Sequence, residues 1–166
     1  EALIATLDLP QGGWSDAARK DALSRLQQAG LPERRDEYWK YTRPDTLTQP
    51  QAVSAAVRAS EDVALFDQID RLKLVFVDGV FDADASDDLA LEGITIERLA
   101  QADADLHWAR DLYGTLEKNG QTPVARPLAA LNTAFAADGV LIHVTDKTSK
   151  PVNIVYRRTS ETADVM

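Results

Sequence analysis

The chain contains no cysteine. This absence excludes disulfide bonds, zinc–thiolate sites and a cysteine nucleophile anywhere in its 166 residues. A second absence is that of long hydrophobic runs, since no stretch of about 18 apolar residues occurs. No basic segment precedes an apolar one near the first residues either. The sequence therefore predicts neither a membrane span nor a secretory signal.

Positive charge is also scarce. Lys and Arg total 18 against 27 Asp and Glu, which gives a net charge of −9 at pH 7. Nucleic-acid and anionic membrane surfaces require clustered cations, so this balance argues against both as partners. We expect a cytoplasmic protein. Its length suits one domain, or one domain and a piece of another.

Two kinds of periodicity divide the chain. Apolar residues at helical spacing predict helices from Ser15, as the N-cap, to Gly30, from 102 to 118, and from Pro127 to Ala136. Short β-rich runs predict strands at 72–77, 94–97, 140–144 and 152–156. Asp78-Gly79 follows the first run and predicts a hairpin with a return strand at Val80-Phe81. The sequence thus predicts an α+β fold.

Residues 30–42 are the densest segment of mixed chemistry. Gly30 and Pro32 separate them from the preceding helix, and a new short helix is predicted to follow, with an Asp36–Lys40 ion pair. The pattern reads Gly30-Leu31-Pro32-x-Arg34-Arg35-x-Glu37-x-Trp39-Lys40-Tyr41-Thr42. It resembles the N-terminal signature of the SufB/SufD family. Two further stretches also resemble that family, Phe76-Val77-Asp78-Gly79-x-Phe81 and 127–136 followed by Asp138-Gly139.

The resemblance implies a non-catalytic scaffold subunit in iron–sulfur cluster assembly. The full-length protein would act in a complex of the SufB–SufC–SufD type, with SufB-like and SufC-like (ABC-type ATPase) partners. It also implies an α+β domain over 1–138, with the first strands of a truncated parallel β-helix at 139–166. The chain starts at Glu1 and its only methionine is Met166, so we expect an N-terminal piece of a longer protein. Because clusters are held mostly by thiolates, no cofactor is expected in this chain.

The signature segment contains the candidate site residues. Arg34, Arg35, Glu37 and Lys40 could form a docking surface or an anion site, but a solvated helix face with weak ion pairs is the simpler interpretation. Trp39 and Tyr41 are interpreted as packing residues, because large rings dominate core energetics.

Other polar clusters are poorer candidates. Asp82-x-Asp84-x-Ser86-x-Asp88 resembles a calcium loop, but it lacks the required Gly and Glu, so an exposed acidic turn is expected. Asp103, Asp105 and His107 cannot converge from one helix. His143, alone on a predicted strand, is interpreted as structural. The alternative function is a small acidic α+β enzyme with carboxylates as general acid and base, which a carboxyl of raised pKa would favour.

Overall fold

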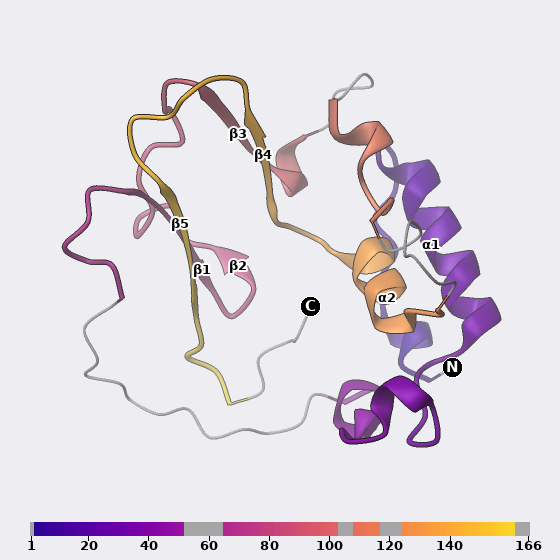
Figure 1. Cartoon of the computed structure of the whole chain (residues 1–166). Coiled ribbons are helices and arrows are strands. Elements are labelled where there is room, and N and C mark those ends of the chain that lie inside the picture. The colour runs from indigo at the N-terminus through magenta and orange to yellow at the C-terminus, as the bar shows by residue number, and fades with distance from the viewer. Residues whose placement is uncertain (1, 52–64, 103–107, 117–123, 162–166) are drawn as a thin grey trace. The chain divides into compact units, whose positions relative to one another are not determined.

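The structure is a computed structural model that describes residues 2–51, 65–102, 108–116 and 124–161. It contains two compact units, unit 1 (1–53, 102–137 and Met166) and unit 2 (54–101 and 138–165). Helices lie in unit 1 and paired strands in unit 2, so the predicted α+β class is confirmed (Figure 1). Among the described residues, no helix has the length and apolarity needed to span a bilayer.

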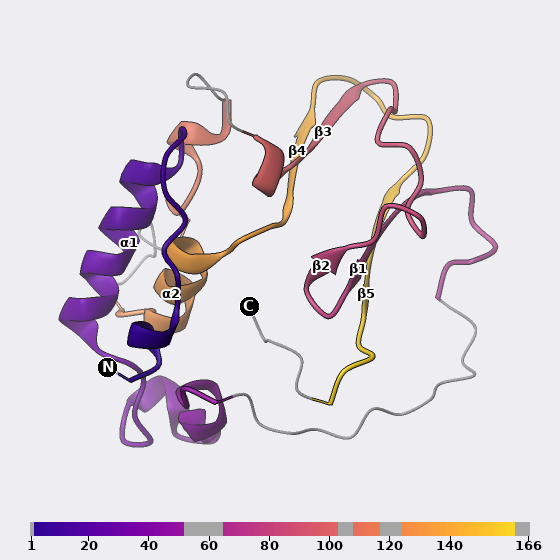
Figure 2. The same cartoon turned by 180° about the vertical axis from the view of Figure 1, so that it is seen from behind.

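Unit 1 is built on two helices, α1 (Asp16–Ala29) and α2 (Pro127–Phe135). They lie side by side in both views (Figures 1 and 2) and enclose a core of Ala22, Leu26, Ala130, Leu131, Ala134 and Phe135. Gly30 ends α1 as predicted, with φ +73° and its N–H donated to the Leu26 carbonyl at 2.8 Å. Pro127 occupies the first turn of α2, where its missing N–H is not needed.

Arg19 is the unexpected core residue of unit 1. Only 4% of it is exposed. Its Nη1 donates to the Ala134 carbonyl at 3.0 Å, and that carbonyl lies in the last turn of α2, where helices leave acceptors unpaired. Ser15 is the N-cap of α1 as predicted, but its hydroxyl makes no capping hydrogen bond and instead accepts one from Arg19 Nε at 3.0 Å.

The helix predicted at 102–118 is not formed in the part of it that the structure describes. That part contains only a 3-10 turn, η5 (Trp108–Asp111), followed by turns. Gly114 has φ +71°, a left-handed conformation that interrupts a right-handed helix. Tyr113 is fixed by tertiary contacts, because its hydroxyl donates to the Thr133 carbonyl at 2.8 Å and its ring packs edge-on against Trp14.

The described part of unit 2 contains five strands in two sheets. These are β1 (Leu72–Val77), β2 (Val80–Phe81), β3 (Ile94–Arg98), β4 (Val140–Val144) and β5 (Val152–Arg157). The order is β2-β1-β5 in one sheet and β3-β4 in the other. β1 and β2 form the predicted hairpin, and φ values of +49° at Asp78 and +84° at Gly79 fit a type I′ turn.

Long-range pairing joins the two halves of unit 2. β5 runs parallel to β1, with Leu72 opposite Val152, and β4 is antiparallel to β3, with Ile96 opposite Ile142. Residues 54–101 and 138–165 thus form one compact unit. The division into domains at 1–138 and 139–166 stays a prediction. The core is Leu72, Leu74 and Ile96 with surrounding apolar side chains.

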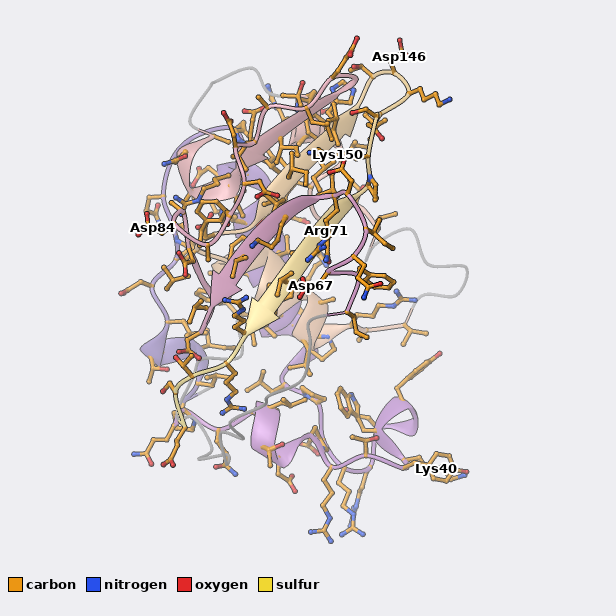
Figure 3. All side chains as sticks on the ribbon, turned by 90° about the vertical axis from the view of Figure 1, so that its left-hand side faces the viewer. Lys40, Asp67, Arg71, Asp84, Asp146 and Lys150 are labelled. Atoms are coloured by element: carbon orange, nitrogen blue, oxygen red, sulfur yellow. The ribbon has the colours of Figure 1, made fainter. Side chains whose placement is uncertain are left out.

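Other 3-10 turns among the described residues include η1 (Ile4–Thr6), η3 (Pro44–Leu47) and η4 (Leu99–Gln101). At 65–71, the Arg71 side chain points to Asp67 and pairs with it (Figure 3). Its Nη1 also donates to the Ile69 carbonyl at 3.2 Å, so one guanidinium fixes the turn that leads into β1.

Candidate functional site

The signature segment folds as three consecutive tight turns. The N–H groups of Asp36, Trp39 and Thr42 donate to the carbonyls three residues earlier, at 3.0, 2.9 and 3.1 Å. The central turn is η2 (Glu37–Trp39). Three residues per turn is 3-10 geometry, in which side chains at i and i+3 lie above one another. The expected short helix is therefore present as 3-10 turns, with a different facial pattern from an α-helix.

This geometry separates the three aromatic residues. Tyr38 and Tyr41 are three positions apart, so they share one face, and they are 72% and 92% exposed. Trp39 belongs to the next face and is half-buried. The packing role expected for Tyr41 is therefore wrong, because a 3-10 period turns its ring outward. We call the exposed set of Arg35, Tyr38 and Tyr41 the tyrosine face.

Cations surround the tyrosine face. Arg34, Arg35 and Lys40 are exposed. Lys40 extends away from the ribbon (Figure 3), with its Nζ 5.5 Å from the centre of the Tyr41 ring, within cation–π range. Exposed tyrosine and arginine next to one another are typical of protein–protein interfaces.

The acidic residues of the segment behave differently from expectation. The Asp36 carboxylate accepts the Glu33 N–H at 2.8 Å, and the predicted Asp36–Lys40 bridge is not among the ion pairs of the described residues. Glu37 begins η2, but its side chain lies outside the described part of the structure.

The acidic loop after β2 bonds to the strand edge. The Asp87 carboxylate accepts the Lys73 N–H at 2.6 Å, and the Ser86 hydroxyl accepts the Val75 N–H at 2.8 Å. These groups continue the pairing of β1 past the short β2. Asp84 is exposed at the outer part of this loop (Figure 3). The exposed acidic turn that was expected is therefore present, and the Ser86 and Asp87 side chains also bond it to the edge of β1.

Asp138 has a similar role at the start of β4. Its carboxylate pairs with Arg98 and accepts the N–H groups of Ala100 at 3.2 Å and Gly139 at 2.8 Å. The Arg98 guanidinium also lies 4.7 Å from the centre of the Phe81 ring. The sequence feature that marks this cluster is the Asp138-Gly139 pair. It was noted as part of a stretch that resembles the family, but no role was predicted for it.

The described residues offer little support for a metal site or for acid–base catalysis. Asp103, Asp105 and His107 lie outside the described residues, and within the described ranges no group of three or more potential ligands converges. His143 is exposed on β4. The pKa of Asp16 is lowered chiefly by its hydrogen bond from Lys20, and that of Asp78 by hydrogen bonds from Thr159. Both shifts run opposite to that needed for a general acid.

Comparison with known proteins identifies the family. Residues 14–154 match the model described as the SufBD protein N-terminal region, so the chain belongs to the SufB/SufD family. All three resembling stretches fall inside this range, and the predicted relationship is confirmed.

The chain is also similar to a curated protein. The chain is 33% identical over 134 residues to the iron–sulfur cluster assembly protein SufD of Escherichia coli (strain K12). The alignment covers 70% of this chain and 31% of that protein, so the chain spans about a third of the length of its relative.

Proposed function

We propose that this chain acts in iron–sulfur cluster assembly as the N-terminal part of a non-catalytic scaffold subunit. The observation that supports this most is the family match over residues 14–154. The similarity to a protein named for cluster assembly supports the same process. The assembly would be of the SufB–SufC–SufD type, with a SufB-like subunit and a SufC-like ATPase as partners.

Deleting the gene that encodes the chain tests the process. We expect a lower activity of cluster-dependent dehydratases during iron limitation, restored by the intact gene and also by added cluster in cell extracts. Unchanged dehydratase activity in the deletion strain would refute the proposal. Reduced activity that added cluster does not restore would place the defect outside cluster assembly.

Within that assembly, we propose that the tyrosine face contacts another protein subunit. Its support is the exposure of Tyr38 and Tyr41 beside the exposed guanidinium of Arg35. The double variant Tyr38→Ala/Tyr41→Ala should reduce co-purification with a tagged SufB-like subunit about tenfold or more. Leu116→Ala, an 85% exposed apolar residue in the same unit, is the matched control. Equal retention of both variants would exclude the tyrosine face.

We propose that cluster ligands lie outside these 166 residues, because they contain no thiolate. Purified chain treated with iron and sulfide should stay colourless. A stable brown absorbance after desalting would show that its oxygen and nitrogen ligands suffice.

Finally, we propose that the strands at 140–157 belong to the first part of a parallel β-helix. The parallel pairing of β5 with β1 supports this, since parallel neighbours are the building unit of such a helix. A structure of a longer product of the gene would test it. Antiparallel strands following β5 would refute it.

A further inference from the structure

The Asp78-Gly79 turn does more than join β1 to β2. Asp78 has φ +49°, in the left-handed region that non-glycine residues seldom occupy. Asparagine or glycine would serve a type I′ turn at least as well as aspartate. The hairpin alone therefore does not explain why a carboxylate stands at this position.

That carboxylate bonds to the segment that follows β5. Its Oδ1 accepts the N–H groups of Thr159 at 2.8 Å and Ser160 at 3.2 Å, and its Oδ2 accepts the Thr159 hydroxyl. The Asp78 N–H donates to the Arg157 carbonyl at 2.9 Å. Asp78 at the hairpin tip thus makes three hydrogen bonds to the segment after β5 and a fourth to the last residue of β5, about 80 positions away.

Arg158 donates hydrogen bonds to backbone carbonyls of the same segment. Its Nε donates to the Ser160 carbonyl at 3.1 Å and its Nη2 to the Glu161 carbonyl at 3.3 Å. Backbone donors of the turn therefore meet a carboxylate, and backbone carbonyls meet a guanidinium. The Asp78 carboxylate and the Arg158 guanidinium therefore supply the hydrogen bonds that a neighbouring strand no longer supplies beyond the end of β5.

We propose that Asp78 is a latch that ends the parallel β1–β5 pair and fixes the path along which the chain leaves β5. The latch consists of Asp78 and its partners Thr159 and Ser160. A carboxylate suits this position better than an amide, because its charge strengthens the bonds from both N–H groups to Oδ1 and its second oxygen accepts the Thr159 hydroxyl, toward which an amide would present a donor. The lowered pKa of Asp78, caused mainly by Thr159, agrees with an anion held by these donors. This role is independent of any part in cluster assembly.

Asp78→Asn tests the latch while keeping the turn, because Asn-Gly is a preferred type I′ pair. Amide hydrogen exchange measured by NMR should become about tenfold faster at Thr159 and Ser160, because the amide oxygen that replaces Oδ1 is uncharged and a weaker acceptor. The Asp82 amide, bonded to the Val75 carbonyl at 2.9 Å, should keep its exchange rate and so report an intact hairpin. Asp84→Asn removes one exposed charge from the same unit and is the matched control.

Unchanged exchange at Thr159 and Ser160 in Asp78→Asn would overturn the latch. If the Asp82 amide also exchanges faster in Asp78→Asn, that variant has lost the hairpin. The variant Thr159→Val then tests the latch in its place. This second variant removes only the hydroxyl donor, so Thr159 and Ser160 amides should exchange several-fold faster with Asp82 unaffected. Wild-type rates in Thr159→Val would reject the proposal.

Discussion

Charged side chains satisfy backbone groups in both units, at a helix end in unit 1 and at strand ends and edges in unit 2. In unit 1, a helix end leaves carbonyls without donors, and the cationic Arg19 supplies one to Ala134. In unit 2, strand ends and edges leave N–H groups without acceptors, and the carboxylates of Asp78, Asp87 and Asp138 supply them. Which backbone group is left unpaired thus determines which side chain is needed.

This difference explains where the negative charge lies. Unit 1 has 12 Asp and Glu against 10 Lys and Arg, a net charge of −2, whereas unit 2 has 15 against 8, a net charge of −7. Part of the acidity of unit 2 is therefore structural. Composition alone suggested a solvated acidic surface, because it does not distinguish a carboxylate in water from one that accepts a backbone N–H.

The largest predicted effects come from removing one core side chain in each unit. Leu26 in unit 1 and Leu74 in unit 2 are both 0% exposed. Each Leu→Ala change should lower the free energy of unfolding of its own unit by about 3–5 kcal/mol, since each leaves a cavity. Amide hydrogen exchange should show lost protection in α1 and α2 for the first variant and in β1 and β5 for the second. Equal losses in both units from either change would mean that they unfold together.

Arg19→Met tests the cation of unit 1. The apolar replacement keeps the bulk but leaves the Ala134 carbonyl without its donor and the Tyr113 ring without the guanidinium 5.5 Å from its centre. We expect a loss of about 2–4 kcal/mol in urea unfolding. Lys20→Met, which breaks the exposed pair with Asp16, is the control and should cost less than about 0.5 kcal/mol. Similar losses for both variants would contradict the assigned role of Arg19.

Local signals in the sequence were sufficient for most elements. Asp78-Gly79 predicted the hairpin and Gly30 predicted the end of α1, because each depends on a conformation that only neighbouring residues determine. The parallel pairing of β1 with β5 was not predictable in this way. It joins residues far apart in the sequence, and periodicity contains no information about which strands become neighbours.

The candidate site was predicted as a segment but not as a surface. An α-helical period was assumed for residues 33–41, whereas the 3-10 period decides that Tyr41 points outward. Arg19 was missed for a related reason. It lies three positions before Ala22 and seven before Leu26, on the buried face of α1, but a charged residue is rarely fully buried without a partner that only the fold supplies.

Gly93→Ala tests how tightly unit 2 is packed between its strands. Gly93 has φ +78°, and a Cβ there would lie 2.8 Å from the Lys147 carbonyl and 3.0 Å from that of Asp146. Because the obstacle is backbone, the segment that follows β4 must shift away from Gly93, at a cost of about 1–3 kcal/mol in the free energy of unfolding. Gly12 has a similar φ of +81°, but a Cβ there would meet no atom within 4 Å. Gly12→Ala therefore separates the cost of the backbone conformation from the cost of the steric clash. Equal costs would assign the whole effect to backbone conformation.

Trp39→Ala and Tyr41→Ala measure the two faces of the signature segment. A half-buried Trp39 should contribute about 1–3 kcal/mol, less than the ~3–5 kcal/mol of a fully buried ring. Tyr41, 92% exposed, should change the free energy of unfolding by less than about 0.5 kcal/mol. Urea unfolding of the isolated chain checks both values. A large loss for Tyr41→Ala would show that its ring packs within the chain and would remove it from the tyrosine face.

The smallest predicted effect is the response of the Asp78 latch to acid. The pKa of Asp78 is lowered below its ordinary value of 3.8, first by the Thr159 hydroxyl, then by the N–H groups of Thr159 and Ser160, with the charge of Arg158 contributing least. Folding therefore favours the carboxylate. The stabilisation is fully present above pH 3.8 and is lost as the pH falls through the lower pKa of the folded state.

The chemical shifts of the Thr159 and Ser160 amide protons, followed by NMR during acid titration, report the protonation of the Asp78 carboxylate. In the wild-type chain they should shift, as the acceptor loses its charge, only below the ordinary aspartate range, and in Asp78→Asn they should not titrate. Arg158→Met should raise the midpoint slightly, because it removes the cation that faces the carboxylate. A wild-type midpoint above the ordinary aspartate value would mean that folding favours the protonated form, and the carboxylate could not then be the group that holds these amides.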